Sequence, residues 1–148
     1  MKFRTLMLTT ATPFALAACS YLGMGGKDDK MAMEMTTPML SATAQPAGNS
    51  VTIAEADIPE DGFLVIHAMK DGKPVVPGSI GHVAIKAGKN SDVTVPLTMM
   101  AEPGTQVLAM LHQDTGTKGV YEFGPGSTNV DLPVMKDGKP VVLPVTIK

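Results

Sequence analysis

Residues 105–124, TQVLAMLHQDTGTKGVYEFG, decide how the rest of the chain must be arranged. Residues 106–112 are apolar enough to form a buried strand, and the Gly-containing segment after them predicts a turn. Residues 120–123 predict a second strand that pairs with the first. Polar side chains gather around the turn: His112, Asp114 and Glu122. We therefore expect two central strands with a polar cluster at one end.

Short apolar segments separated by turn residues continue on both sides of this pair. They cover residues 51–58, 63–69, 79–86, 93–98, 130–135 and 141–147. Gly, Pro, Asn and Asp separate them at intervals of roughly 8–12 residues, and no stretch carries a helical stripe. The pattern predicts an all-β domain, an antiparallel β-sandwich of about seven to eight strands that is immunoglobulin-like or cupredoxin-like.

The octapeptide MKDGKPVV occurs twice, at residues 69–76 and 135–142. Asp-Gly is a strong hairpin signal, because both central residues of a type I′ turn need positive φ angles. The two copies are too far apart to belong to a solenoid of helical repeats. We therefore expect the same hairpin turn to be used twice.

Residues 1–18 predict a signal peptide rather than part of the fold. A basic start, Lys2 and Arg4, precedes an apolar run over residues 6–15 that is short for a membrane span. The sequence LAAC then ends at Cys19 and resembles the lipobox of bacterial lipoproteins, in which the cysteine is lipidated. Cys19 is the only cysteine, so no intramolecular disulfide competes for it. An ordinary secretory signal is the alternative.

Lipidation of Cys19 predicts a protein that is anchored to a membrane without spanning it. Stable anchoring takes more than one acyl chain, which a diacylated cysteine supplies. The residue after the cysteine is Ser20 rather than an aspartate. If the organism is a Gram-negative bacterium, this resembles the pattern of lipoproteins that are sorted to the outer membrane and face the periplasm. Residues 19–49 then predict the lipidated cysteine and a flexible Met-rich tether, and residues 50–148 predict the β-sandwich in the cell envelope.

The balance of charge excludes nucleic acid as a partner. Removing Lys2 and Arg4 from the 12 basic residues leaves ten lysines and no arginine, against 14 acidic residues. A mildly acidic chain without arginine has neither a basic stripe nor a guanidinium for bidentate phosphate contacts.

Methionines crowd the predicted tether at Met31, Met33 and Met35. Spaced thioethers suit the soft ions Cu(I) and Ag(I), so one interpretation is a metal-binding segment. The simpler alternative is a chance Met-rich linker or a segment that adheres to lipid.

A second group combines His67, His82 and His112 with Met69 and Met110. Residues two apart on a strand share a face, so His67 joins Met69 and Met110 joins His112. If the two strands are neighbours and the imidazoles lie within about 5 Å, these donors suit a copper ion. The only cysteine is assigned to the lipid, which excludes a blue-copper site. The alternative is strand-end histidines bonded to backbone, with methionines in the core.

The segment from Asp114 to Glu122 has the outline of a calcium loop, with an acid at its first and ninth positions. Gly116 and Lys118 stand where further ligands should be, and a lysine there repels a cation. The alternative is that Asp114 caps the turn and that Glu122 is exposed.

Sequence motifs of catalysis are missing. Ser79 and Ser91 lack a Gly-x-Ser-x-Gly context, and no HExxH, phosphate-loop or dinucleotide fingerprint occurs. We therefore expect no enzyme, but a non-catalytic binding or structural module of the envelope. The alternative function is Cu(I) or Ag(I) binding, by the three tether methionines together with His67 and His112.

The segments VIHAM, KAGKNSDVTVPL, VLAMLHQDTGTKGVYEFG and GKPVV…VTI form a further pattern over residues 50–148. Together they resemble an uncharacterised domain of secreted and surface proteins in archaea and bacteria, sometimes found beside cupredoxin modules. The LHxD…GxYEF segment is the most specific part. The resemblance implies an exported β-sandwich and implies no activity.

Overall fold

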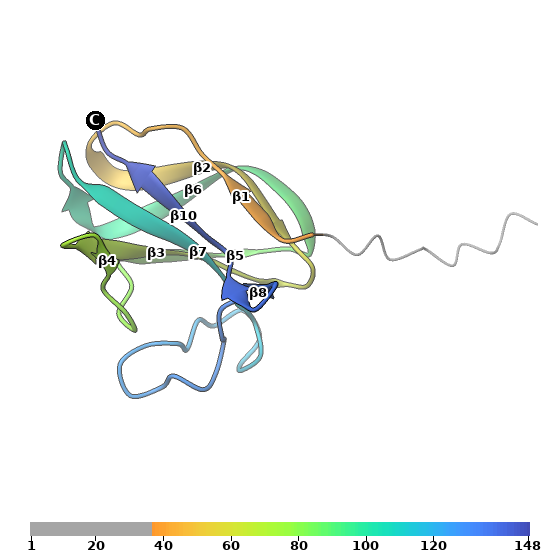
Figure 1. The fold of residues 1–148 in the computed structure, drawn as a ribbon. Coiled ribbons are helices and arrows are strands. Elements are labelled where there is room, and N and C mark those ends of the chain that lie inside the picture. Colours follow the sequence, from red (N-terminus) through yellow and green to blue (C-terminus); the bar gives the residue numbers. More distant parts are fainter. Residues whose placement is uncertain (1–36) are drawn as a thin grey trace, which may run out of the picture. The chain divides into compact units, whose positions relative to one another are not determined.

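The computed structural model describes residues 37–148, which form two antiparallel sheets packed face to face (Figure 1). One sheet has the strand order β1 (Met39–Ser41), β2 (Gly48–Ile58), β6 (Gly88–Ala101). The other has the order β10 (Val142–Thr146), β7 (Gln106–Gln113), β3 (Gly62–Lys70), β4 (Lys73–Pro74), with β5 (Gly81–Ile85) also paired to β3. A separate hairpin joins β8 (Met135–Lys136) to β9 (Lys139–Pro140).

The predicted all-β sandwich is confirmed. The described residues contain ten strands rather than seven to eight, because several are only two or three residues long. No helix in this part of the chain is long and apolar enough to cross a membrane.

The main core lies between the two sheets. Alternate residues of each strand point into it, because side chains on a strand alternate between its faces. Its largest buried members are Ile53, Ile58, Leu64, Ile66, Leu111 and Ile147. Full burial of one such side chain stabilises the fold by roughly 1.5–3 kcal/mol, so this layer is the main source of stability.

The five-stranded sheet is also covered on its other face, which we call the outer face. Phe63, Val65 and His67 of β3 lie on the outer face, and all three are buried. Ring contacts place Tyr121, in the segment between β7 and β8, against Phe63. The apolar segment over residues 63–69 is therefore a central strand that is covered on both sides.

The two copies of MKDGKPVV fold into equivalent hairpins. Met69 pairs with Pro74 in the first, as Met135 pairs with Pro140 in the second. Asp71 and Asp137 both have a φ angle of 51°, and the glycine after each is also positive. The repeated sequence is thus one turn used twice, as its Asp-Gly signal predicts.

The predicted pairing of residues 120–123 with the strand before them is wrong. β7 pairs with β3 on one side and β10 on the other, so no position is left for a third partner. Residues 120–123 cross the outer face as irregular chain, and the predicted strand over 130–135 is reduced to a bridge at Pro133 and the start of β8. The apolar side chains Tyr121 and Phe123 of this segment pack against the outer face, but its backbone is not paired.

The folded part begins before residue 50, where the sequence analysis began the domain. Met39–Ser41 pairs with residues 55–57 of β2, and Gln45 bridges to Ile147. These residues complete the edge of the three-stranded sheet, although the short segment carries no strand signal of its own. The predicted signal peptide, Cys19 and the three tether methionines lie outside the described residues.

Candidate functional site

His67 and His112 meet on the outer face of the five-stranded sheet. His112 of β7 stands opposite Phe63 of β3, and His67 stands opposite Leu108. The pair Val65 and Met110 lies between these two rows. The imidazole rings lean across this middle row, so their centres are 5.8 Å apart with 40° between the ring planes. Neither side chain is exposed to solvent.

Each histidine uses one ring nitrogen on a backbone carbonyl. Nδ1 of His67 donates to the carbonyl of Gly78 at 2.8 Å, and Nδ1 of His112 donates to that of Asp131 at 2.6 Å. A carbonyl only accepts, so the proton of each neutral ring is on Nδ1 and the lone pair is on Nε2. Both Nε2 atoms are buried without a hydrogen-bond partner, as is the hydroxyl oxygen of Tyr121.

Burial keeps the two imidazoles neutral at pH 7. It lowers the pKa of His112 to about 4, although the bond to Asp131 acts in the opposite direction. It also lowers the pKa of His67, against the effect of the bond to Gly78. A buried polar atom without a partner costs about 1–3 kcal/mol. Packing alone does not explain why the Nε2 atoms of two neighbouring histidines are both buried without a hydrogen-bond partner.

Aromatic rings surround the pair. The ring of Tyr121 is 5.4 Å from that of His112 and 5.3 Å from that of Phe63, centre to centre. The ring centre of Phe123 lies 4.9 Å from that of His112. Burial raises the pKa of the Tyr121 hydroxyl, so this group stays protonated. The histidine nitrogens therefore lie in a dry setting of low dielectric.

Asp131 is the residue of this region that sequence reasoning missed. Its carboxylate is fully buried and accepts backbone N–H groups of Thr115, Gly116 and Glu122. Burial raises its pKa, but these three bonds together hold the pKa below its ordinary value. Among the described residues the ion pairs join other side chains, so the charge of Asp131 has no cationic side chain beside it. No local pattern marks an aspartate whose partners lie 9 to 16 residues earlier.

The other predicted donors divide into two sets. Met110 shares the outer face with the two histidines and is 6% exposed. Met69 lies at the far end of β3, where it lines a surface hollow of about 140 Å³ with Met99 and Met100. His82 of β5 is exposed, although its ring contacts Tyr121.

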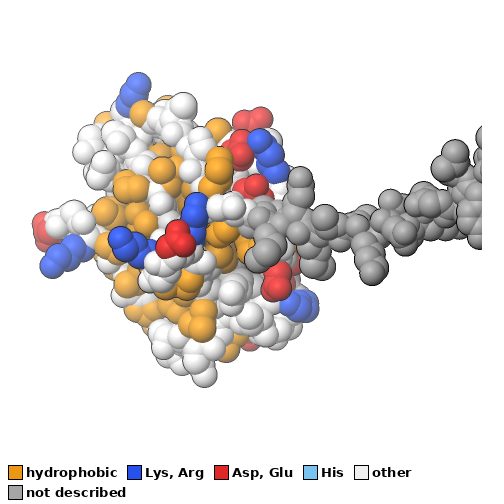
Figure 2. Space-filling view, turned by 45° about the vertical axis from the view of Figure 1, so that its right-hand side comes forward, with side chains coloured by type: hydrophobic (Ala, Val, Ile, Leu, Met, Phe, Trp, Pro, Cys, Tyr) orange, Lys and Arg blue, Asp and Glu red, His pale blue; other side chains and the backbone are white. Residues whose placement is uncertain are grey.

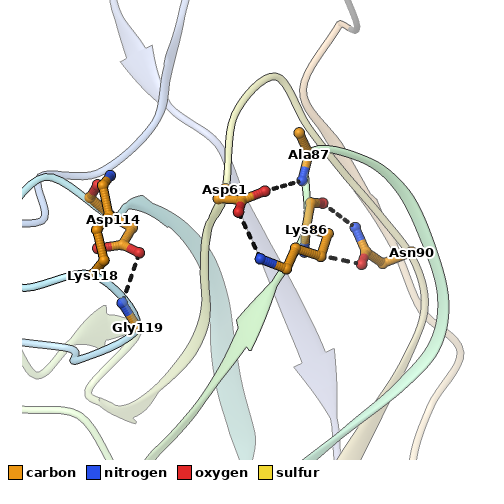
Figure 3. Close-up of polar contacts among 7 residues, drawn as sticks. All are labelled: Asp61, Lys86, Ala87, Asn90, Asp114, Lys118 and Gly119. Carbon is orange, nitrogen blue, oxygen red and sulfur yellow. Dashed lines mark hydrogen bonds and ion pairs between the residues drawn. The ribbon is translucent and has the colours of Figure 1, made fainter.

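The two carboxylates of the calcium-like segment are engaged with backbone. Asp114 accepts the N–H of Gly119 at 2.9 Å, and the ammonium of Lys118 donates to its carbonyl (Figure 3). Glu122 accepts the N–H of Thr117 and is half-buried rather than exposed. Nowhere in residues 37–148 do three or more His, Cys, Asp or Glu side chains come together in a way that could hold a metal ion.

A second polar cluster lies across a surface hollow from Asp114. Asp61 accepts the ammonium of Lys86 at 2.7 Å and the N–H of Ala87 at 2.9 Å, and Asn90 bonds back to Lys86 (Figure 3). The hydrogen bonds of Lys86 and Asp61 lower the pKa of the acid and raise that of the base. The cluster fixes the turn between β5 and β6, which is a structural role.

The surface carries both signs of charge. Figure 2 shows Lys and acidic side chains scattered between hydrophobic patches on the face drawn, without a broad field of one sign. The hydrophobic side chains that are most exposed in the described residues include Met99, Met100 and Met135.

Residues 37–148 thus form an all-β module of two sheets, with a buried histidine pair on the outer face of the five-stranded sheet. The chain belongs to a family defined by a domain of unknown function (DUF7282), whose model matches residues 38–148. It is similar to cell surface glycoprotein 1 of Haloarcula hispanica, with 32% identity over 116 residues, and to cell surface glycoprotein 2 of the same organism, with 30%.

Each similarity covers 78% of this chain but only 12% of the relative, so the chain spans about an eighth of the length of these curated proteins. No solved structure matches the chain significantly. The comparisons are consistent with a surface module that is shared by much longer proteins.

Proposed function

We propose that this protein is a non-catalytic β-sandwich module of the cell surface, held at the envelope through a lipid on Cys19. The observation that carries the proposal is the similarity, over 116 residues, to two proteins named as cell surface glycoproteins. In the long relatives this domain is a small part of the chain. In this chain the LAAC motif, which ends at Cys19, supplies the means of attachment.

The described residues support a module without catalysis. A catalytic histidine needs a nucleophile or substrate within hydrogen-bond reach of one ring nitrogen and an orienting group on the other. His67 and His112 each have the orienting bond, to a carbonyl, but no side chain meets either Nε2 atom. With aromatic rings packed around them, the two imidazoles have no exposure to solvent.

The test compares the wild-type chain with Cys19→Ser in cells. We expect the wild type to partition with membranes and to show, by mass spectrometry, a lipid-modified cysteine at the start of the processed chain. The Cys19→Ser variant should leave the membrane fraction, and Ser20→Ala, at the next residue, should not. An unmodified thiol on the wild-type protein, or unchanged partitioning of Cys19→Ser, would contradict the anchor.

A further inference from the structure

We propose that His67 and His112 form a buried two-coordinate site for a monovalent soft metal ion, Cu(I) or Ag(I), with Met110 as the neighbouring thioether. The site is separate from the proposed envelope attachment and stands on the geometry of the outer face alone. Two imidazoles that share one ion have ring centres at most about 6 Å apart, because each ligand bond is about 2 Å long and each nitrogen lies about 1 Å from its ring centre. The observed separation of the ring centres is 5.8 Å, longer than the distance of about 5 Å named in the sequence analysis but within this limit.

The hydrogen bonds prepare both rings for metal. A metal-bound histidine typically donates its second ring N–H to a carbonyl or carboxylate, which fixes the tautomer and the ring orientation. His67 and His112 both do so, to Gly78 and Asp131. Both Nε2 lone pairs are left buried and unpartnered, so an ion between them satisfies two atoms that the protein does not.

The number and kind of donors select the ion. Zinc in structural sites takes four protein ligands, and no group of three His, Cys, Asp or Glu that could hold a metal occurs in the described residues. Cu(I) and Ag(I) accept imidazole and thioether donors. Met110 lies on the same face, in the row between the two histidines, and is almost completely buried.

The surrounding charge also favours a single positive charge. Two neutral imidazoles leave the full charge on the ion, which is costly in an apolar layer unless an opposite charge is near. Asp131 supplies that charge, since its buried carboxylate has no cationic side chain beside it and its own carbonyl bonds His112. A divalent ion would remain only half compensated.

Titration of the full chain in detergent with Ag(I), a redox-inert stand-in for Cu(I), tests the site by NMR of the imidazole nitrogens. We expect one Ag(I) per chain to shift the Nε2 resonances of His67 and His112 together and to leave those of His82 in place. His82 is the matched control, because it is exposed and outside the pair. Unshifted Nε2 resonances of the pair in the folded wild type overturn the proposal.

Competition against a coloured Cu(I) chelator measures the affinity of variants whose folding is checked by circular dichroism. His67→Gln and His112→Gln should each weaken binding by more than about 100-fold, because even outer-shell partners of a metal are worth 10–100-fold. The affinity for Cu(I) should stay within about twofold of the wild-type value in two controls. These are His82→Gln and a chain with Met31, Met33 and Met35 all changed to Leu. Loss of binding only in the methionine-substituted chain would place the ion on that segment and reject the buried site. If a histidine variant fails to fold, the wild-type NMR result decides.

Discussion

Acid should destabilise this protein through His112, whose imidazole is buried. The folded protein holds this imidazole neutral with a pKa of about 4, against an ordinary value of 6.5 in the unfolded chain. Between these values the unfolded state binds a proton that the folded state does not, so stability falls as the pH falls. The full difference amounts to about 3 kcal/mol, at about 1.4 kcal/mol per pH unit.

The contribution of His112 is therefore present above pH 6.5, is lost progressively towards pH 4, and changes little below that. His67 adds to the slope in the same direction, since burial lowers its pKa as well. The lowered pKa of Asp131 acts at lower pH, because the unfolded carboxyl titrates near its ordinary value of 3.8.

Urea unfolding followed by circular dichroism, in the presence of a metal chelator, measures this slope at half-unit steps of pH. Between pH 4 and pH 6.5, the free energy of unfolding of His112→Gln should depend on pH less steeply than that of the wild type, by about 1.4 kcal/mol per pH unit. His82→Gln should differ less from the wild type, because that ring is exposed. Equal slopes for wild type and His112→Gln would show that the imidazole is not held neutral by burial, and would refute the reasoning.

Three further substitutions test the packing around the histidine pair, each by urea unfolding at pH 7. Gly62→Ala should cost about 3 kcal/mol, because its Cβ would lie 2.2 Å from the carbonyl oxygen of His112, whereas Gly48→Ala meets no atom within 4 Å and should change little. Asp131→Asn should cost about 2 kcal/mol, because an amide cannot accept all three N–H groups, while the exposed Asp92→Asn, also at a positive φ, should be neutral. Leu111→Ala should cost about 3 kcal/mol, because this fully buried side chain would leave a cavity in the main core; a loss below 1 kcal/mol would contradict its placement.

The sequence predicts the strands well where burial and backbone pairing coincide. Residues 63–69 and 106–112 are mostly apolar, and both lie in strands whose central residues are buried on two faces. It fails over residues 120–123, because Tyr121 and Phe123 are needed as a cover over the outer face rather than as members of a ladder. A periodic pattern reports which side chains are buried and leaves open what the backbone does.

The same limit applies to the site. That His67 and His112 face the same side follows from strand alternation only once β3 and β7 are neighbours in the observed register. From the sequence alone, their pairing could be posed only as a condition. The role of Asp131 could not be predicted, because its carboxylate bonds backbone groups on the other side of the irregular segment. Long-range polar contacts of this kind depend on the path of a loop, and loop paths leave little trace in local sequence.

The register between β3 and β7 determines whether the histidine pair exists at all. A slip of one residue would turn His112 towards the main core and replace it on the outer face by a neighbour, because side chains alternate with a period of two. Gly62 opposes that slip: it stands opposite Gln113, where the carbonyl of His112 passes so closely that a Cβ would collide with it. A residue with a side chain, brought to this position by a shifted register, would meet the same oxygen. The glycine at the start of β3 thus favours the one alignment in which Val65 and Met110 pair, and in which the two imidazoles can lean together across them.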